Sequence, residues 1–191
     1  MAYCNWLSEQ AMLAPAYDEY GNLLDKQGQI TTNIKEVEGY RLLTEAEWEY
    51  AASGGHLAPE PRNLYSGSNN IDEVAWYEEN SNVDETGRRT QPVGQKKPNE
   101  LGIYDMSGNV WEWVHDWWTN GPYTDYPKTD PIGPLEEPFF YIEGNLVSGR
   151  VNRGGTWKDT TQHSRIAMRE WDTLDRIYAA TGFRIARTLF E

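Results

Sequence analysis

The chain has 191 residues, of which 38% are hydrophobic, enough for one domain with a core that buries about two thirds of the extended surface. Its formal net charge of −13 would repel a phosphate backbone or an anionic membrane surface, so we expect no nucleic-acid partner. No apolar run approaches the roughly 18 residues that a membrane-spanning helix needs, so we expect no membrane span.

Cys4 is the single cysteine of the chain. It cannot form an intrachain disulfide or build a cysteine metal site by itself, and we interpret it as a small buried thiol. No signal peptide is visible. These features leave the localisation open: cytoplasmic if the chain is complete as given, exported if an N-terminal segment is missing.

The first 55 residues contain two predicted helices. The opening stretch MAYCNWLSEQ has the composition of a helix, and a loose polar region with turn signals at Gly21 and Gly28 follows. Thr44 and Glu47 have the spacing of a capping box, and Gly54-Gly55 would end the helix that begins there. The second helix is the better defined of the two.

The rest of the chain predicts short strands joined by long loops. The segments EVAWYEENS, TQPVG, LGIYDM, RVNRGGTW and GFRIAR contain β-branched or aromatic residues and are separated by Gly, Pro and Asn. We interpret the acidic run IDEVAWYEE as a solvated strand face, and residues 119–149, rich in proline and glycine, as an irregular excursion. The fold class expected is α+β, loop-rich and low in regular secondary structure.

The stretch DMSGNVWEW holds two acids on either side of a Ser-Gly-Asn turn. Asp105 and Glu112 are hard oxygen ligands of the kind that calcium takes, but they could equally accept hydrogen bonds from backbone amides. The spacing alone leaves both readings open. In a strand, Trp111 and Trp113 would point to one face, and we interpret Trp113 as mostly core and Trp111 as a pocket wall.

Five motifs together resemble the formylglycine-generating enzyme, or sulfatase-modifying factor, family. They are YRLLTEAEWEYAA, PNELGIYDMSGNVWEW, RVNRGGTW, the pair Arg165 and Arg169, and GFRIAR. They occur in the family's order between residues 41 and 187. The resemblance implies a C-type-lectin-like core with short antiparallel strands and two early helices. It also implies that residues 1–191 are a single domain lacking the usual N-terminal strands, so that a partner chain or a missing N-terminal segment would complete the core.

The resemblance implies a structural calcium ion at residues 105–112. Asp105 and Glu112 stand at the family's side-chain ligand positions, and Gly108 and Val110 at its carbonyl positions. The family's second calcium site, upstream, has no ligand-by-ligand match in the acidic region around Asp72 to Glu85.

The family's oxidases bind copper through two cysteines after the RGG[ST]W-like strand. The corresponding stretch here, KDTTQHS at residues 158–164, has no cysteine, and copper(I) needs soft thiolates, so we expect neither copper nor an assignable catalytic residue. Trp111 and Thr156 stand where the family lines its active-site pocket. His163 lacks histidine partners and is predicted to face solvent. The predicted pocket consists of Trp111, Thr156, Trp157, Asp159, His163 and Trp171.

Three functions remain open. The first is a calcium-stabilised module without catalysis that binds a protein or a glycan through a surface of Trp157, Thr160, Thr161, Gln162, His163, Trp171 and Asp172; its variant is a hypervariable display protein of a diversity-generating retroelement, varied within residues 157–181. The second is an oxidoreductase that converts a substrate cysteine to formylglycine in sulfatase maturation. The third is a structural or maturation accessory.

Overall fold

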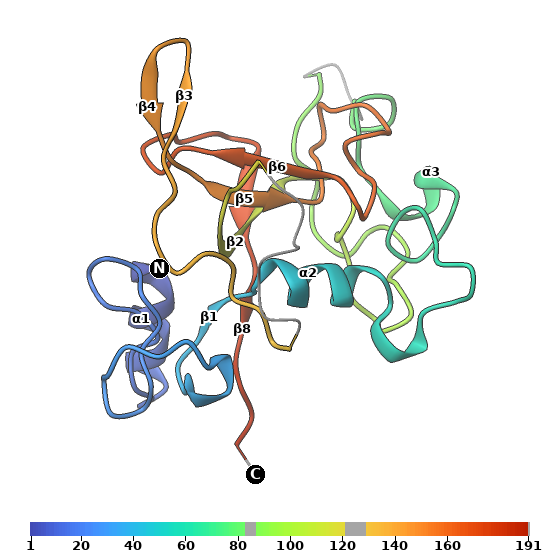
Figure 1. The fold of residues 1–191 in the computed structure, drawn as a ribbon. Helices are drawn as coiled ribbons and strands as arrows, with labels where there is room; N and C mark the ends of the chain where they lie inside the picture. The colour runs from blue at the N-terminus through green and yellow to red at the C-terminus, as the bar shows by residue number, and fades with distance from the viewer. Residues whose placement is uncertain (83–86, 121–128, 191) are drawn as a thin grey trace. The chain divides into compact units, whose positions relative to one another are not determined.

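A computed structural model describes residues 1–82, 87–120 and 129–190. The chain divides into two compact units. Unit 1 is Met1–Ala46, His115–Ser148 and Arg184–Glu191, and unit 2 is Glu47–Val114 and Gly149–Phe183. The loop-rich α+β class predicted from the sequence is confirmed, with short helices and strands set in long loops (Figure 1).

Unit 1 contains the first predicted helix, α1 (Ala2–Gln10), and a two-stranded sheet of β1 (Arg41–Leu42) and β8 (Ile185–Ala186). The strands are antiparallel, with Arg41 opposite Ala186. The Asn5 side chain fixes the chain that follows α1, because its Oδ1 accepts hydrogen bonds from the amides of Ala16 and Tyr17. A 3-10 turn, η1 (Ile34–Glu36), precedes β1.

A β-hairpin lies inside the region that we expected to be irregular. β3 (Phe140–Ile142) pairs antiparallel with β4 (Asn145–Val147). Glu143 (φ 49°) and Gly144 (φ 83°) join them, and two positive φ angles define the type I′ turn that suits a tight hairpin. The prediction for 119–149 is therefore wrong at 140–147, because Glu-Gly is a weaker turn signal than Asn-Gly. Residues 121–128 lie outside the described residues.

The second predicted helix is α2 (Glu45–Ala52). It ends where expected, since Gly54 (φ 89°) and Gly55 (φ 57°) take left-handed conformations that release the chain from the helix. At its start, the amide of Glu45 donates to Oδ2 of Asp116 at 2.7 Å. A side chain distant in sequence thus supports the first turn beside the predicted capping-box residues. A 3-10 turn, η2 (Gly55–Leu57), follows.

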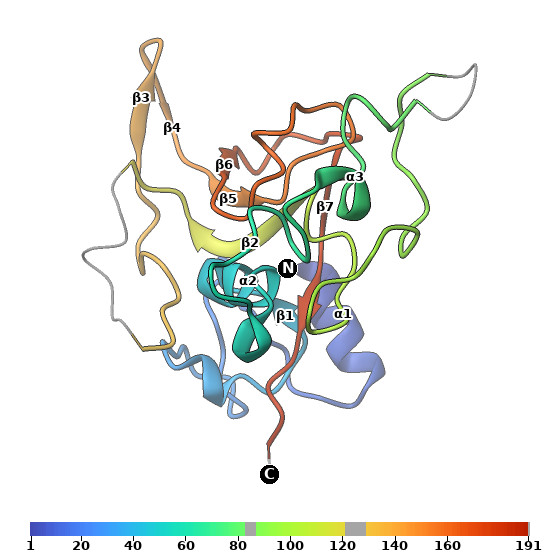
Figure 2. The same ribbon diagram turned by 90° about the vertical axis from the view of Figure 1, so that its right-hand side faces the viewer.

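Unit 2 is built on a four-stranded sheet with the order β6-β5-β2-β7. Its strands are β2 (Trp111–Trp117), whose first four residues belong to this unit, β5 (Arg150–Arg153), β6 (Arg169–Asp172) and β7 (Thr181–Phe183). β5 and β6 lie side by side (Figures 1 and 2) and pair antiparallel, with Val151 opposite Trp171. β2 and β7 run parallel, with Trp111 opposite Thr181. The strands predicted in RVNRGGTW and GFRIAR are found here.

The strand predicted over EVAWYEENS is wrong. The structure has the short helix α3 (Ile71–Val74), capped by Asn70, whose side chain accepts a hydrogen bond from the amide of Asp72. Ile71, Val74 and Ala75 follow the three- and four-residue spacing of a helix, and with Tyr65 and Tyr77 they form a buried cluster. The run is therefore not a solvated strand face.

The segments TQPVG and LGIYDM are also loops rather than strands. In the second, Oδ1 of Asn99 accepts hydrogen bonds from the amides of Leu101 and Ile103. A side chain thereby satisfies backbone donors that a strand neighbour would otherwise satisfy. The apolar residues of these loops were read as strand signals because single-sequence patterns do not reveal such side-chain partners.

Candidate functional site

The turn of the DMSGNVWEW motif is made by three residues in left-handed conformations: Asp105 (φ 58°), Gly108 (φ 74°) and Asn109 (φ 67°). Gly108 lies against the backbone of Trp76 so closely that a Cβ atom would collide with the Trp76 carbonyl oxygen. The amide of Asn109 donates to that oxygen at 2.7 Å, and the amide of Gly108 donates to the carbonyl of Gly154 at 2.7 Å. Glycine is therefore required at position 108 for both conformation and space.

Asn109 connects this turn with two other segments. Its side-chain Oδ1 accepts from the amide of Gln91 at 3.0 Å, its Nδ2 donates to the Gln91 carbonyl at 3.2 Å, and its own carbonyl accepts from the amide of Trp157 at 2.9 Å. The RGGTW segment is thus fastened to the turn by Asn109. Sequence reasoning missed this role, although an Asn after Gly in a tight turn is the signal that could have revealed it.

Each predicted carboxylate ligand also holds a hydrogen-bond donor. Oδ2 of Asp105 accepts from the amide of Gly94 at 2.7 Å, and Oε2 of Glu112, a residue only 6% exposed, accepts from the indole Nε1 of Trp48 at 2.7 Å. Both carboxylates are thereby fixed in position.

The main-chain carbonyls of the same turn point toward Gly154. The carbonyl oxygens of Met106 and Val110 lie 3.5 and 3.8 Å from the position that a Cβ atom on Gly154 would take. In the described part of the chain no group of three or more His, Cys, Asp or Glu side chains could hold a metal. The available donor set therefore combines two carboxylates with main-chain carbonyls, all oxygen, which is the chemistry that calcium prefers.

The sheet of unit 2 has two chemically different faces. The bond between Glu112 and Trp48 places Glu112 on the side of α2, and the guanidinium of Arg153, 5.1 Å from the Trp48 ring centroid, lies on that side too. We call this the inner face. Because side chains alternate along a strand, Trp111, Trp113 and Asn152 lie on the opposite side, which we call the outer face.

The inner face is closed. Trp48, Val114, Val151 and Arg153 are all 0% exposed. Nη2 of Arg153 pairs with Oε2 of Glu49 at 2.7 Å and donates to the Ile166 carbonyl at 2.9 Å. The inner face is therefore the core of unit 2.

The outer face carries half-buried tryptophans. Trp111 meets the His163 ring edge to face, with centroids 6.4 Å apart. Trp113, which we interpreted as mostly core, is half-buried like Trp111. Nδ1 of His163 lies 3.1 Å from Oγ1 of Thr160, which orients the imidazole. His163 is half-buried against Trp111 rather than facing solvent alone. The structure thus brings two predicted pocket residues, Trp111 and His163, into contact.

Thr156 and Asp159 shape the loop that carries His163. Thr156, at 0% exposure, donates from Oγ1 to Oδ2 of Asp159 at 2.9 Å, and its amide donates to the same oxygen at 3.1 Å. Trp157 is half-buried, and its carbonyl accepts from Oγ of Ser81 at 2.6 Å. Thr156 is therefore a buried residue that supports the loop through its hydrogen bonds to Asp159.

Trp171 is not brought to this surface. It lies opposite Val151 in the β5–β6 register, and Val151 is on the inner face with Arg153. The indole of Trp171 therefore lies on the other side of the sheet from Trp111. Single-sequence reasoning placed the two together because it had no strand register.

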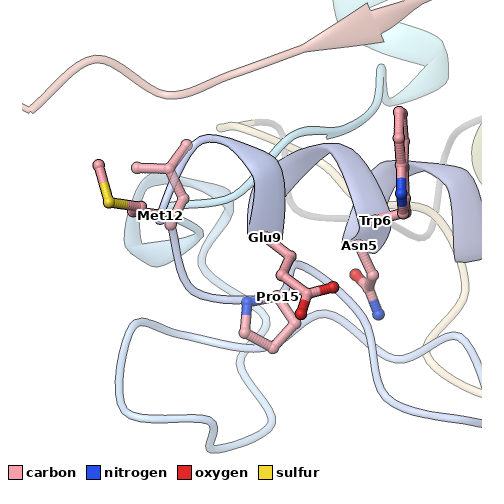
Figure 3. Close-up of a pocket in the computed structure, with 6 residues that line it drawn as sticks. Asn5, Trp6, Glu9, Met12 and Pro15 are labelled. Carbon is pink, nitrogen blue, oxygen red and sulfur yellow. The ribbon is translucent and has the colours of Figure 1, made fainter.

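Unit 1 has its own surface hollow, which the sequence did not indicate (Figure 3). Its volume is about 560 Å³, and it is lined by Asn5, Trp6, Glu9, Met12, Leu13 and Pro15. Trp6 is 52% exposed and stacks at a tilt on Tyr3, with ring centroids 5.5 Å apart. On the same helix, burial raises the pKa of the Cys4 thiol, which favours the unreactive protonated form.

Comparison with known proteins places the chain in a family. The sequence model of the family described as the sulfatase-modifying factor enzyme 1-like domain matches residues 1–189. The chain belongs to this family. The order of its motifs and its loop-rich fold agree with that membership.

Its relatives have different names. Chaperone protein LppX of Paenibacillus barcinonensis is 34% identical over 206 residues, covering 97% of this chain and 65% of that protein. The formylglycine-generating enzyme of Thermomonospora curvata is 34% identical over 167 residues, covering 78% of this chain and 49% of that enzyme. The chain thus spans about half to two thirds of the length of these relatives.

The solved structure of Treponema denticola variable protein 1 superposes with a TM-score of 0.74 at 32% identity, covering 98% of this chain and 67% of that one. PvdO from Pseudomonas aeruginosa superposes with a TM-score of 0.64 at 28% identity, covering 98% of this chain and 58% of that one. Among the described residues, no helix is long and apolar enough to cross a membrane.

Proposed function

We propose that this member of the family is a binding module that lacks the oxidase's copper-binding cysteine pair and recognises its ligand through the surface around Trp111. One observation carries the proposal. The segment at residues 156–164 presents hydroxyl, carboxylate and imidazole groups. Thr156 is hydrogen-bonded to Asp159, and Thr160 is hydrogen-bonded to His163. Cys4, the one thiol in the sequence, is buried in α1 of unit 1.

This donor set does not suit copper(I), which binds soft thiolates and thioethers. It leaves a half-buried indole, an imidazole oriented by Thr160 and a loop held by the hydrogen bonds of Thr156 and Asp159, which are features of recognition. We therefore do not assign the formylglycine chemistry to this chain, although four formylglycine-generating enzymes are among its relatives at 32–35% identity.

The test is a turnover assay on a peptide containing Cys-x-Pro-x-Arg, with copper, calcium, dioxygen and a reductant, read by mass spectrometry. The formylglycine-generating enzyme of Streptomyces coelicolor, run in parallel, is the positive control. We expect an unchanged peptide with this protein. Conversion of the cysteine to an aldehyde by this protein would make it an oxidase and overturn the proposal.

We also propose a structural calcium ion at residues 105–112, held by the carboxylates of Asp105 and Glu112 and the carbonyls of Gly108 and Val110. Two carboxylates and two carbonyls would supply oxygen ligands of the kind that calcium takes. The positive φ angles of Asp105 and Gly108 turn this stretch tightly enough to gather such donors. Bound calcium would fix the turn from which β2 and Trp111 start.

The similarity to Treponema denticola variable protein 1 favours the display alternative. Exposed residues cluster within 157–181: Lys158, Thr160, Gln162, Arg165, Ala167 and residues 174–179. Such surface positions tolerate substitution with little loss of stability, as a hypervariable surface needs. Sequencing the gene and its flanks from many isolates would test this alternative. Substitutions confined to codons 157–181, beside a template repeat and a reverse transcriptase gene, would support it, and uniform variation along the gene would exclude it.

The accessory alternative is favoured by the relative named chaperone protein LppX, which aligns with 97% of this chain. An accessory needs a surface for a partner chain or for a further segment that completes the core. The exposed Tyr3, Trp6 and Met12 of unit 1 offer apolar area for this role. A monomeric protein that melts cooperatively and binds no hydrophobic dye would contradict it.

A further inference from the structure

The outer face of the unit 2 sheet has the chemistry of a carbohydrate site. We propose that it binds a neutral oligosaccharide, with Trp111 and Trp113 as the stacking platform and Asn152 as a polar anchor. The proposal rests on the proposed binding function and names the ligand class of that surface.

The two indoles occupy consecutive outward positions of one strand. Two residues along a strand cover about 7 Å, so the rings of Trp111 and Trp113 can contact neighbouring parts of one extended ligand. The parallel register adds Thr181 and Phe183 from β7 beside them, and Phe183 is 46% exposed. Together these residues form an aromatic strip along the β2–β7 edge of the sheet.

The indole N–H groups of this strip are available to a ligand. Among the described residues, neither Trp111 nor Trp113 has a hydrogen-bond acceptor for its Nε1. A donor at the rim of a flat apolar ring suits a ligand that is apolar on its faces and polar at its edge.

Asn152 is the second, independent observation. It is only 3% exposed, and its Oδ1 is buried without a hydrogen-bond partner among the described residues. A buried acceptor without a partner destabilises a fold and is retained where something else satisfies it. Asn152 lies on the same face as the two indoles, so a ligand hydroxyl on that face is a suitable donor.

Two fixed carboxylates flank Asn152. In the β5–β6 register Glu170 lies opposite Asn152, and Asp172 opposite Arg150, so all four side chains are on the outer face. Oε1 of Glu170 accepts from the amide of Trp171 at 3.2 Å, and Oδ1 of Asp172 accepts from the amide of Thr173 at 2.8 Å. These bonds orient the carboxylates before any ligand arrives, which lowers the entropy cost of binding.

The charge balance favours a neutral ligand. Residues 157–181 contain four cations (Lys158, Arg165, Arg169 and Arg176) and four acids (Asp159, Glu170, Asp172 and Asp175), so this segment has no net charge, and the whole −13 lies in the remainder. An anionic ligand would be repelled by the protein as a whole. A pyranose chain is neutral, has apolar C–H faces for the indoles and presents hydroxyls to the amide and the carboxylates.

The experiment screens the protein on an array of neutral oligosaccharides and, in parallel, against a displayed library of random peptides. The best glycan is then titrated by calorimetry into the protein and four variants. Trp111→Ala and Trp113→Ala should each weaken glycan binding roughly tenfold, since each removes one stacking ring. Trp6→Ala removes an exposed indole from α1 in unit 1 and should change the affinity less than about twofold.

Asn152→Leu separates a binding role from a structural one. Leucine has a similar volume and removes the unpartnered acceptor, so the melting temperature should be unchanged or higher while glycan affinity falls about tenfold. Weaker binding with a parallel loss of folding stability would show that Asn152 supports the fold and does not anchor the sugar.

The outcomes distinguish the two proposals. Glycan binding that is lost in Trp111→Ala supports the inference. Glycan binding that survives both tryptophan substitutions overturns it. No glycan binding, together with peptide binding that Trp111→Ala abolishes, overturns the sugar inference and leaves the binding function standing. A folded protein that retains neither glycan nor peptide would overturn both.

Discussion

The two faces of the unit 2 sheet arise from the same strands and differ in almost every respect. On the inner face, Glu112 accepts from the Trp48 indole, Arg153 covers the Trp48 ring, and Trp48, Val114, Val151 and Arg153 are 0% exposed. On the outer face, Trp111 and Trp113 are half-buried, and Asn152 has a buried acceptor without a described partner. Strand alternation therefore places Glu112, the acceptor of the buried Trp48, and the half-buried Trp111 and Trp113 on opposite faces of the sheet within one WEW tripeptide.

The many tryptophans of this chain do not all have the same role. Trp48 is fully buried and held by a specific acceptor, whereas Trp111 contacts the imidazole of His163 and is half-buried. Substitutions on the inner face should reduce stability, and substitutions on the outer face should reduce binding.

The largest effect should come from Trp48→Ala. The side chain is 0% exposed, so its loss leaves a cavity beneath the sheet and removes the donor that Glu112 accepts. We expect the free energy of unfolding to fall by about 4 kcal/mol, measured by urea denaturation. A loss no greater than that of Trp111→Ala would contradict the distinction between the faces.

Gly108→Ala tests the tight turn before β2, the strand that contributes side chains to both faces of the sheet. The new Cβ would collide with the Trp76 carbonyl at a φ angle of 74°, so strain and overpacking should together cost about 3 kcal/mol. Gly144→Ala is the matched control, because Gly144 also has a positive φ angle of 83° but nothing lies within 4 Å of its Cβ position. The control should lower the free energy of unfolding by only about 1 kcal/mol. Equal losses of stability in thermal melts would show that the collision with the Trp76 carbonyl is not the cause.

Glu112→Gln tests calcium at the base of the inner face. Glutamine keeps an acceptor for the Trp48 indole and removes the carboxylate charge. With calcium at about one hundred times its dissociation constant, the wild type should gain about 2.7 kcal/mol over the EDTA-treated protein, and the variant much less. Differential scanning calorimetry measures both. If calcium did not change the melting temperature of the wild type, the proposed calcium site would be wrong.

Tyr77→Phe tests the loop that carries Trp76 to the turn. The Tyr77 hydroxyl donates to Asp72 at 3.1 Å and to Glu79 at 3.3 Å, and burial together with these carboxylates raises the pKa of Tyr77 well above its usual value near 10. The neutral form is the one stabilised. Its contribution is therefore complete below pH 10 and is lost as the pH rises beyond it, because the unfolded chain ionises first.

The variant should consequently lose about 1 kcal/mol at neutral pH and show a shallower decline of stability above pH 10 than the wild type. Urea unfolding at a series of alkaline pH values checks this. Identical slopes for the two proteins would mean that the pKa of Tyr77 is not raised in the folded protein.

A loss of stability as small as that of Tyr77→Phe, about 1 kcal/mol, should follow Trp111→Ala, because the ring is only half-buried. Its main effect should appear in ligand binding. A loss of several kcal/mol in urea denaturation would place Trp111 in the core and erase the difference between the faces.

Several features could be predicted from the sequence because their signals are local. The Thr44–Glu47 spacing and the Gly54-Gly55 pair locate α2, and the five motifs identify the family and its loop-rich fold. The alternation of Trp111 and Glu112 also follows from strand geometry.

Other features depend on contacts between distant segments and could not be predicted. The pairing of Val151 with Trp171 places Trp171 on the inner face, away from Trp111. Asn109 fastens residues 91 and 157 to the turn through bonds that no local pattern reveals. The segment from Ile71 to Tyr77 was read as a strand because its acidic and aromatic residues obscured a short helical spacing.

Trp111 and Trp113, in our proposal, face a ligand, whereas Trp48 faces the core of unit 2. The most direct measurement labels the protein with 5-fluorotryptophan, assigns these three resonances with Trp→Phe variants and adds a soluble paramagnetic relaxation agent. We expect strong broadening of the Trp111 and Trp113 resonances and little broadening of the Trp48 resonance, because Trp48 is 0% exposed. Equal protection of all three indoles would mean that the outer face is closed, and would contradict the account.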